Sequence, residues 1–444
     1  MKNYRLISPY ANVKWDGKDA WHRYKGNLHT HSVASDGEMD LRDAVLAYYN
    51  RDFDFLAMTD HGVTGRPWDE CPSKPLMYRA FRAMRHYKLN WFTSEEAQKI
   101  ADGSFPLPDG HARGKGMLCV PGGNEMCNLT ATKTHVNGFF MKGCEMFGGK
   151  ENDYECAVKA VQENGGISFM NHPGSWLNTN KDINKIHDPF LTHYFGNILL
   201  KYPTCLGIEV FNEKNSSTPW DRHLWDHLLQ YCLPHGKKVI AFSNGDMHIE
   251  KDVDSSFCYF FMPDLTLDSV KKAMHDGTSL CVTRIIRKNE TFGPDADMDN
   301  RDAAHPVPLF DRIETHEHTV QVQISDFDRL QWIANGKVIK EERFDSVQDG
   351  GTFTLDLDTV ENADTFSYIR MQVSSPYGIC LTQALVIDNG TAPLPFVESE
   401  EDKKQLRDLR RKSNRAYIAL KGILGEIPYR IRLMKARKNG TADR

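Results

Sequence analysis

The sequence lacks several features that would place it in familiar classes of protein. No run of about 18 apolar residues occurs, which excludes a membrane-spanning helix. The segment from Met1 to Trp15 has no apolar core of the kind found in signal peptides. No P-loop, dinucleotide-binding glycine fingerprint or G-x-S-x-G nucleophile motif is present. We therefore expect a cytoplasmic protein whose chemistry does not depend on these motifs.

Paired cysteines are also missing. The 10 cysteines are spread singly along the chain, and none forms a C-x-x-C pair. Neither a zinc finger nor a disulfide framework is therefore indicated, and reduced thiols are expected.

Charge is unevenly distributed over the 444 residues. The formal net charge is −5, but the segment from Lys403 to Arg444 contains 14 Lys or Arg and 3 Asp or Glu, a local charge of +11. The rest of the chain then carries −16. An acidic body with a basic tail is not typical of a general nucleic-acid binder.

The tail, residues 393–444, contains a helical stretch with an apolar stripe among basic residues. The stripe consists of Leu406, Leu409, Tyr417, Leu420 and Leu424. Such a helix can anchor a chain to a membrane surface or to nucleic acid. We favour the alternative, in which the stripe docks on this chain or on a second copy and the basic face meets the acidic body.

Residues 1–290 alternate between strand and helix patterns. Strands are predicted at 24–29, 53–59, 116–125, 134–141, 166–171, 206–211, 238–242, 256–262 and 280–285, and helices at 39–50, 74–100, 153–164, 220–233 and 267–275. This alternation is typical of β-α units, and it predicts a parallel sheet that closes into a barrel.

The pattern changes after a turn-rich linker at residues 291–308. Residues 309–392 alternate apolar and polar side chains between turn signals, which predicts a small β-sandwich module of about seven short strands. This module is expected to support one wall of the barrel or to mediate a homo-oligomer.

Metal-ligating side chains recur at the ends of successive predicted strands. They are His29, His31 and Asp36; Asp60 and His61; Glu125; His135; His172; and Asp246 and His248. The carboxyl ends of barrel strands converge on one face, where active sites lie. So many ligands are too numerous for one ion and suit two or three, with a carboxylate such as Glu125 bridging two of them. By contrast, His316-Glu317-His318 has no such neighbours and is expected to be structural or exposed.

The ordered series resembles the polymerase and histidinol phosphatase (PHP) domain, over roughly residues 22–285. Within that family the chain is most similar to the stand-alone metallohydrolase branch. The resemblance implies a distorted (β/α)7 barrel that holds two or three divalent ions of zinc, manganese or iron.

The resemblance also implies a ligand set for each ion. The first ion would take His29, His31, Glu125 and Asp246; the second Glu125, His135 and His172; and the third Asp36, His61 and His248. Asp60 would orient a neighbouring ligand. Apart from the resemblance, a metal-bound water or a histidine such as His61 or His111 could protonate a leaving group, and the sequence leaves this choice open.

Two insertions, residues 63–115 and 176–204, are expected to rise from the same face and to form walls or a lid that sets substrate choice. Arg66, His111, Lys133 and Asn244 are candidates for substrate binding. The sequence leaves open whether each of these residues binds substrate or packs within a loop.

The residues point to a hydrolase in which divalent ions activate water. The leading hypothesis is a phosphoesterase acting on a small phosphorylated molecule. The alternative is hydrolysis of carboxylic or carbamic esters or of amides at the same centre. A non-catalytic binding protein and a nuclease are further alternatives, and we rank both below the hydrolases.

Overall fold

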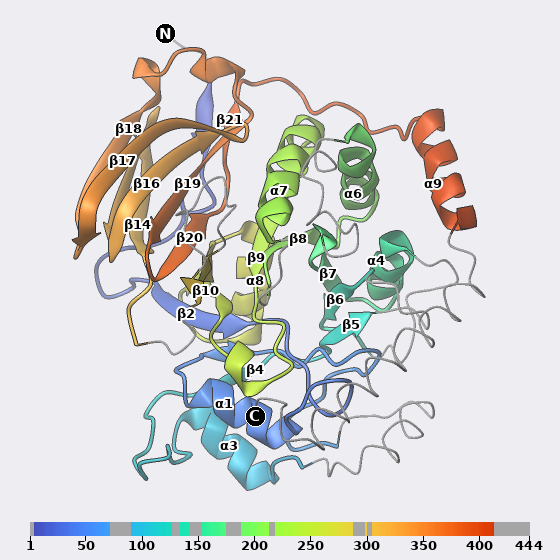
Figure 1. Ribbon diagram of the computed structural model, residues 1–444, viewed down its shortest axis with the longest axis vertical. Coiled ribbons are helices and arrows are strands. Elements are labelled where there is room, and N and C mark those ends of the chain that lie inside the picture. Colours follow the sequence, from blue (N-terminus) through green and yellow to red (C-terminus); the bar gives the residue numbers. More distant parts are fainter. Residues whose placement is uncertain are drawn as a thin grey trace.

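The computed structural model describes residues 4–71, 90–126, 134–142, 153–174, 188–212, 218–286, 298–299 and 304–412 (Figure 1). Lys133, Trp176 and most of the 74–100 segment lie outside these ranges. Within them, no helix has the length and apolar character needed to cross a membrane.

The strands around the predicted barrel fall into two sheets. Strands β2 (His22–Asn27), β3 (Phe55–Leu56) and β4 (Leu118–Cys119) pair in parallel. The second sheet runs in the order β5 (Asn124–Met126), β6 (Val136–Phe139), β7 (Ile167–Met170), β8 (Cys205–Phe211) and β9 (Ile240–Ser243). Isolated bridges from Thr30 to Met247 and from His61 to Glu125 join the two sheets. The described strands thus do not close into one continuous barrel, which corrects that part of the expectation.

Strand direction also departs from the expected parallel sheet. The pairs β5–β6 and β6–β7 are antiparallel, and β10 (Ser256–Met262) runs antiparallel to both β2 and β11 (Ser279–Thr283). The connection from β5 to β6 is shorter than the dozen or so residues that a parallel crossover needs. Local chain length therefore dictates the antiparallel pair beside Glu125.

Apolar side chains from both sheets meet in one interior. Phe169 on β7 stacks on Phe242 on β9 with ring centroids 4.4 Å apart, and Phe55 on β3 lies 4.9 Å from Phe260 on β10. Leu28, which precedes His29, belongs to the same cluster and is fully buried. The interior anchors the strands whose ends carry the metal-ligating residues.

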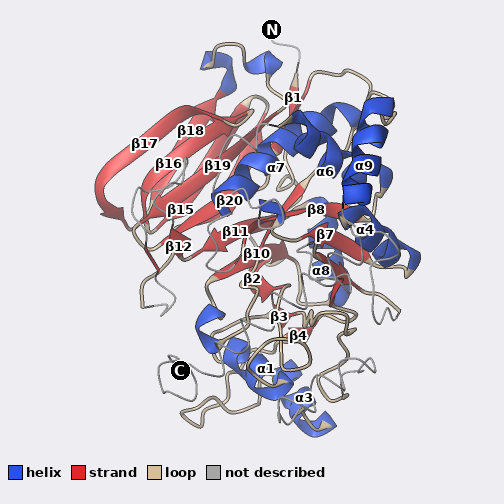
Figure 2. Ribbon diagram, turned by 45° about the vertical axis from the view of Figure 1, so that its right-hand side comes forward, coloured by secondary structure: helices blue, strands red, loops and turns tan. Residues whose placement is uncertain are grey.

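Helices cover this core (Figure 2). They are α1 (Leu41–Tyr49), α3 (Ser94–Asp102), α4 (Tyr154–Glu163), α6 (Pro189–Lys201), α7 (Thr218–Cys232) and α8 (Leu267–Asp276), with 3-10 turns at Leu233–His235, Glu250–Asp252, Leu357–Thr359 and Ala363–Thr365. The single helix predicted over 74–100 is wrong at its C-terminal part. Residues 90–93 are not helical, and Thr93 begins a new helix through a capping box with Glu96.

The insertion at 176–204 is described only from residue 188 onward. Its described part is mainly α6, which buries Tyr194, Phe195, Ile198 and Leu199 in a core shared with α7 and β8. This helix connects the parallel strands β7 and β8, so it belongs to the layer around the sheet.

The β-rich part of the chain extends the barrel sheet. Its strands are β14 (Leu309–His316), β15 (Thr319–Ser325), β16 (Phe327–Ala334), β17 (Lys337–Gln348), β18 (Gly351–Asp356), β19 (Tyr368–Ser375), β20 (Gly378–Thr382) and β21 (Leu385–Asp388). Strands β14, β15 and β18 form one sheet. The remaining strands, β16, β17, β19, β20 and β21, belong to the sheet of β10 and β2, which they join through the pairing of β20 with β11. At the far edge, β1 (Arg5–Ile7) pairs with β21. Two short strands, β12 (Ile285–Ile286) and β13 (Met298–Asp299), pair with each other.

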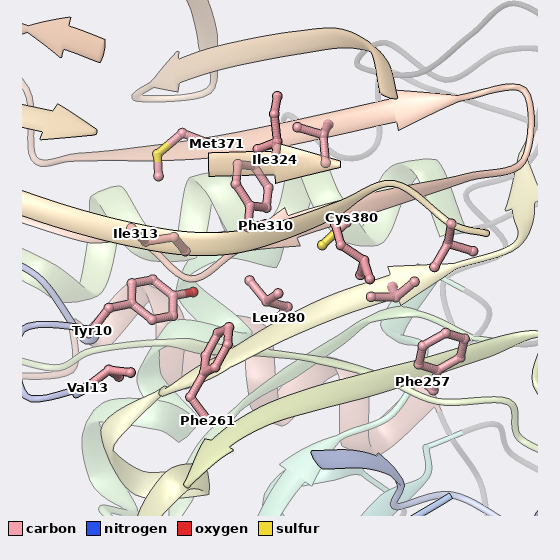
Figure 3. Packing of buried hydrophobic residues seen from close by; sticks show 14 of the residues in the cluster. Tyr10, Val13, Phe257, Phe261, Leu280, Phe310, Ile313, Ile324, Met371 and Cys380 are labelled. Carbon is pink, nitrogen blue, oxygen red and sulfur yellow. The ribbon is translucent and has the colours of Figure 1, made fainter. Parts of the chain in front are cut away.

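One hydrophobic core spans the boundary between the two parts of the chain. Figure 3 shows Phe261 and Leu280 from the barrel strands packed near Phe310, Ile313 and Met371 from the β-rich part. The continuous sheet and this common core mean that residues 309–392 share their packing with the barrel.

The basic tail begins with α9 (Glu400–Lys412), which lies beside α6 (Figure 1). Leu406 is buried there, and the Arg410 guanidinium is 2.6 Å from an oxygen of Asp153 and 3.1 Å from one of Glu155, both near the start of α4. The described part of the tail thus docks on this chain, as favoured above. Residues 413–444, with Tyr417, Leu420 and Leu424, lie outside the described residues.

Candidate metal centre

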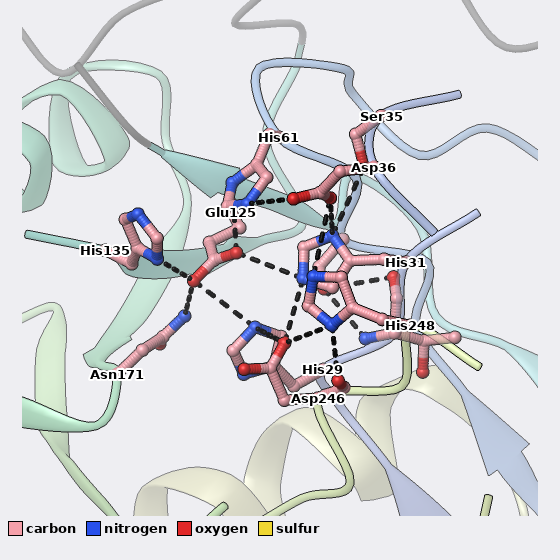
Figure 4. Close-up of polar contacts among 12 residues, drawn as sticks. His29, His31, Ser35, Asp36, His61, Glu125, His135, Asn171, Asp246 and His248 are labelled. Carbon is pink, nitrogen blue, oxygen red and sulfur yellow. Dashed lines mark hydrogen bonds and ion pairs between the residues drawn. The ribbon is translucent and has the colours of Figure 1, made fainter. Parts of the chain in front are cut away.

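The predicted ligands come together from the ends of strands distant in sequence (Figure 4). His29 and His31 follow β2, His61 follows β3, Glu125 lies within β5, His135 precedes β6, His172 follows β7, and Asp246 and His248 follow β9. The interior packing and the two isolated bridges bring these ends to one place.

The best-buried group consists of His29, His31, Glu125 and Asp246. The Nε2 atoms of His29 and His31 each lie 3.0 Å from Oδ1 of Asp246. His29 Nε2 lies 3.3 Å from Glu125 Oε1, and His31 Nε2 lies 3.1 Å from Glu125 Oε2. Two imidazoles and two carboxylates therefore face one point, which is the four-residue set assigned above to the first ion.

Glu125 serves more than one group because its two oxygens face different histidines. His135 Nδ1 lies 2.9 Å from Oε1, and His61 Nδ1 lies 3.1 Å from Oε2. His61, Glu125 and His135 thus form a second group of converging ligand atoms. A carboxylate placed in this way can bridge two ions.

A third group contains Asp36, His61 and His248 together with His31. The Nε2 atoms of His61 and His248 both lie 3.5 Å from an Asp36 oxygen, and His31 Nδ1 lies 3.6 Å from Asp36 Oδ1. Asp36 is 41% exposed, so this group is the most open of the three.

His172 lies next to these groups. Its Nε2 is 3.5 Å from Glu125 Oε1 and 3.9 Å from Asp246 Oδ2. Both His172 and Asp246 have positive φ angles, 25° and 46°, a strained conformation for residues other than glycine. Such strain persists where the surrounding structure holds a side chain in a functional position.

Donor chemistry and burial both fit divalent ions. The Nε2 atoms of His29 and His31 lie 3.0 Å from the Oδ1 atom of Asp246, and all three atoms are buried, but none makes a hydrogen bond of normal geometry among the described residues. Buried polar atoms without partners are costly, and a cation at their point of convergence would satisfy all three. Imidazole and carboxylate ligands suit zinc, manganese and iron alike.

The electrostatics of the centre keep its carboxylates ionised. Burial alone would raise the pKa of Glu125, but His135, His61 and His29 hold it well below its usual range. Burial lowers the pKa of His135 to about 4, against the opposite effect of Glu125. Burial would lower the pKa of His29 and of His172, but Asp246 and Glu125 raise both above the usual value, so a binding ion would displace a proton from these two rings.

Polar residues behind the ligands hold them in place. Asp60 accepts hydrogen bonds from the backbone N–H and the hydroxyl of both Ser32 and Ser35, at 2.7–3.1 Å. These bonds hold the loop that carries Asp36. Asn171 Nδ2 donates to Glu125 Oε1 at 2.8 Å.

Sequence reasoning missed Ser32 and Ser35 as supports of that loop. It also gave no role to Glu209, whose carboxylate lies 3.1 Å from His29 Nδ1. A charged residue inside the otherwise apolar strand 205–211 was the available signal.

The predicted substrate residues do not gather around the ligands. His111 is 84% exposed, and its Nδ1 lies 3.4 Å from Asp109. Arg66 is half exposed and lies 3.5 Å from Glu70. Asn244 is fully buried. Its side-chain amide accepts a hydrogen bond from the backbone N–H of Leu28 and donates one to Glu209. Lys133 is outside the described residues.

Comparison with known proteins gives weak likenesses only. No protein-family model matches the sequence, and no curated protein does. A two-domain protein from Bacteroides vulgatus, named for a PHP-like metal-dependent phosphoesterase, is 17% identical, with a TM-score of 0.40 over 87% of this chain and 99% of that one. A lesion-specific endonuclease from Pyrococcus furiosus is 14% identical, with a TM-score of 0.31 over 57% of this chain and 56% of that one.

A metal-dependent phosphoesterase from Bifidobacterium adolescentis, so named, is 12% identical, with a TM-score of 0.27 over 51% of this chain and 88% of that one. The Bacteroides vulgatus protein is thus named for the PHP-like class that the motif series resembles. At these TM-scores the likeness assigns no activity.

Proposed function

We propose that the chain is a metal-dependent hydrolase with a centre of two or three divalent ions. The observation that carries this proposal is the position of Glu125, whose oxygens face ligand histidines of two different groups. When bound, such ions lower the pKa of a coordinated water and polarise the group under attack. No serine or cysteine nucleophile is then required.

The chain's own residues would each have a defined task. His29, His31 and Asp246 hold one ion with Glu125. His135 and His172 lie near Oε1 of that carboxylate. A further group of Asp36, His61 and His248 lies toward the exposed side, where a substrate can approach. The His61 side chain is 14% exposed and contacts both Asp36 and Glu125, so it is positioned to hold or move a proton there.

With three divalent ions bound, charge balance would favour an anionic substrate, and so a phosphoester over a neutral ester. The inward-facing carboxylates are Asp36, Glu125 and Asp246. The positive charge of three divalent ions would exceed the negative charge of these carboxylates. It would still do so if the carboxylates of Asp60 and Glu209, which lie behind the ligands, were counted as well. The excess positive charge would attract a phosphoryl group and stabilise charge that develops on it in the transition state.

Phosphate release from a panel of mononucleotides, sugar phosphates and aryl phosphates tests this proposal. The protein would be reconstituted with manganese or with zinc. His29→Ala should lose both bound metal and phosphate release. His316→Ala, the matched control from the exposed His-x-His motif in β14–β15, should retain both.

Each negative result has its own meaning. Metal retention without phosphate release from any substrate would contradict the phosphoesterase. The same protein would then be assayed on carboxylic and carbamic esters and on amides. A chain that binds no divalent ion would overturn the hydrolase proposal altogether.

A further inference from the structure

Glu209 is a buried carboxylate that the proposed reaction does not use as a ligand. It lies on β8, where every residue from Cys205 to Phe211 is buried, and it is itself 0% exposed. An ionised carboxylate in such a place is costly unless strong hydrogen-bond donors surround it. Its surroundings therefore indicate what it does.

Three side chains donate hydrogen bonds to this carboxylate. Oε1 accepts from His29 Nδ1 at 3.1 Å and from Asn244 Nδ2 at 3.0 Å. Oε2 accepts from Asn212 Nδ2 at 2.7 Å. Asn244 cannot turn its amide around, because its Oδ1 accepts the backbone N–H of Leu28 at 2.7 Å. Both oxygens of Glu209 are thus held in fixed positions.

The contact with His29 determines which imidazole nitrogen faces the metal centre. A carboxylate oxygen accepts only, so Nδ1 carries the hydrogen in this bond. Nε2 is then directed at Asp246 Oδ1 and Glu125 Oε1, at 3.0 Å and 3.3 Å. We propose that Glu209 is a positioning residue that fixes the orientation and the Nε2-binding form of His29. The inference rests on the proposed metal centre and names a residue that controls it.

The donor set explains why a carboxylate is needed at this position. With Gln at 209, one oxygen would be replaced by an amide NH₂ that faces a donor from Asn212 or from His29. An unfavourable donor–donor contact would follow on one side, and His29 would either lose its acceptor or keep only the weaker amide oxygen. Substitutions of groups that orient metal-ligating histidines typically weaken metal binding by about 10–100-fold.

Chelator competition on the zinc-loaded full chain measures this effect directly. Glu209→Gln should release zinc at a chelator concentration about 10–100-fold lower than wild type. The matched control is Glu155→Gln, which alters a part-buried carboxylate that accepts from Lys201 and Tyr202 away from the centre. It should behave as wild type. If Glu209→Gln does not fold, Asn212→Leu removes one donor to the same carboxylate and should show a smaller loss in the same direction.

A second measurement separates positioning from a purely structural role. In zinc-loaded protein labelled with ¹⁵N-histidine, the Nδ1–H proton of His29 is identified by its absence in His29→Gln. This resonance should move upfield in Glu209→Gln, because a neutral amide accepts a hydrogen bond more weakly than a carboxylate.

The outcomes are distinguishable from those of the proposed function. Zinc retention equal to wild type and an unshifted His29 proton in Glu209→Gln would overturn the positioning role alone, even if thermal stability fell. A wild-type chain that binds no zinc would overturn the metal centre itself and this inference with it.

Discussion

Removing the charge of Arg370 should destabilise the whole protein, because a buried ion pair ties α7 to the β-rich sheet. Arg370 on β19 is 0% exposed, and its Nε and Nη2 lie 2.8 Å and 2.7 Å from the two oxygens of Asp226 on α7. Tyr368 donates a further hydrogen bond to the same carboxylate at 2.5 Å. Burial alone would lower the pKa of Arg370, but Asp226 raises it, so the guanidinium stays charged.

The cost follows from leaving Asp226 buried without its partner. Breaking a buried ion pair by removing one side chain costs about 3–5 kcal/mol. Unfolding entropy is about 2.1 cal/mol/K per residue, or roughly 0.9 kcal/mol/K for a chain of this length that unfolds as one unit. Arg370→Met should therefore lower the melting temperature by roughly 3–6 °C.

Calorimetry at one fixed metal content tests this prediction. The matched control is Arg329→Met, which removes the Arg329–Glu341 pair on β16 and β17, where both side chains are partly exposed. That change should cost less than about 1 kcal/mol. The double variant Asp226→Leu/Arg370→Met should recover much of the lost stability, because no lone charge remains. An Arg370→Met protein as stable as the control, or a β-rich part that melts separately, would refute the reasoning.

Three further predictions concern other parts of the chain. Asp60→Ala should lower the number of bound ions, measured by elemental analysis, because the loop carrying Asp36 loses four hydrogen bonds; an unchanged stoichiometry would contradict the role of that loop. Burial raises the pKa of Asp221 well above its usual range, so its contribution to stability is complete below about pH 3.8 and is lost as the pH rises toward the folded-state pKa. Asp221→Asn, which can still accept from Gly174 N, should therefore melt above wild type at neutral pH, with a difference that shrinks toward pH 4; a pH-independent difference would exclude this account. Deleting residues 398–444 should leave the bound metal unchanged while lowering the melting temperature, and loss of the ions would show that the tail belongs to the centre.

Most of the candidate ligand residues could be predicted from sequence because they follow short apolar strands, whereas Glu125 lies within β5 and His135 precedes β6. His29 and His31 have the same His-x-His spacing as His316 and His318, yet only the first pair is repeated by ligand types at other strand ends. In the structure His318 contacts the Tyr4 carbonyl and Asp358, which agrees with its expected structural role. Context along the chain, not the local motif, separates the two pairs.

Other features depend on contacts that no local pattern encodes. The pairing of β20 with β11 joins residues about a hundred positions apart, so the alternating pattern of 309–392 could not distinguish a separate module from an extension of the barrel sheet. The position of Asn244 illustrates the same limit. Its position in sequence, close to Asp246, suggested that it contacts substrate. In the structure its buried side-chain amide forms hydrogen bonds with Leu28 and Glu209 instead.

The pairing of β1 with β21 has a consequence for how the chain is made. Arg5 and Asp388, which are partners in this ladder, are separated by 383 residues. During synthesis β1 is produced long before its partner β21. Strand β1 therefore stays unpaired until almost the whole chain exists. Contacts of such sequence separation form late and leave nascent chains prone to aggregation. A chain truncated before residue 385 would lack β21, so its β1 would have no strand to pair with. A chain that ends after α9 would contain both strands and could form the complete sheet.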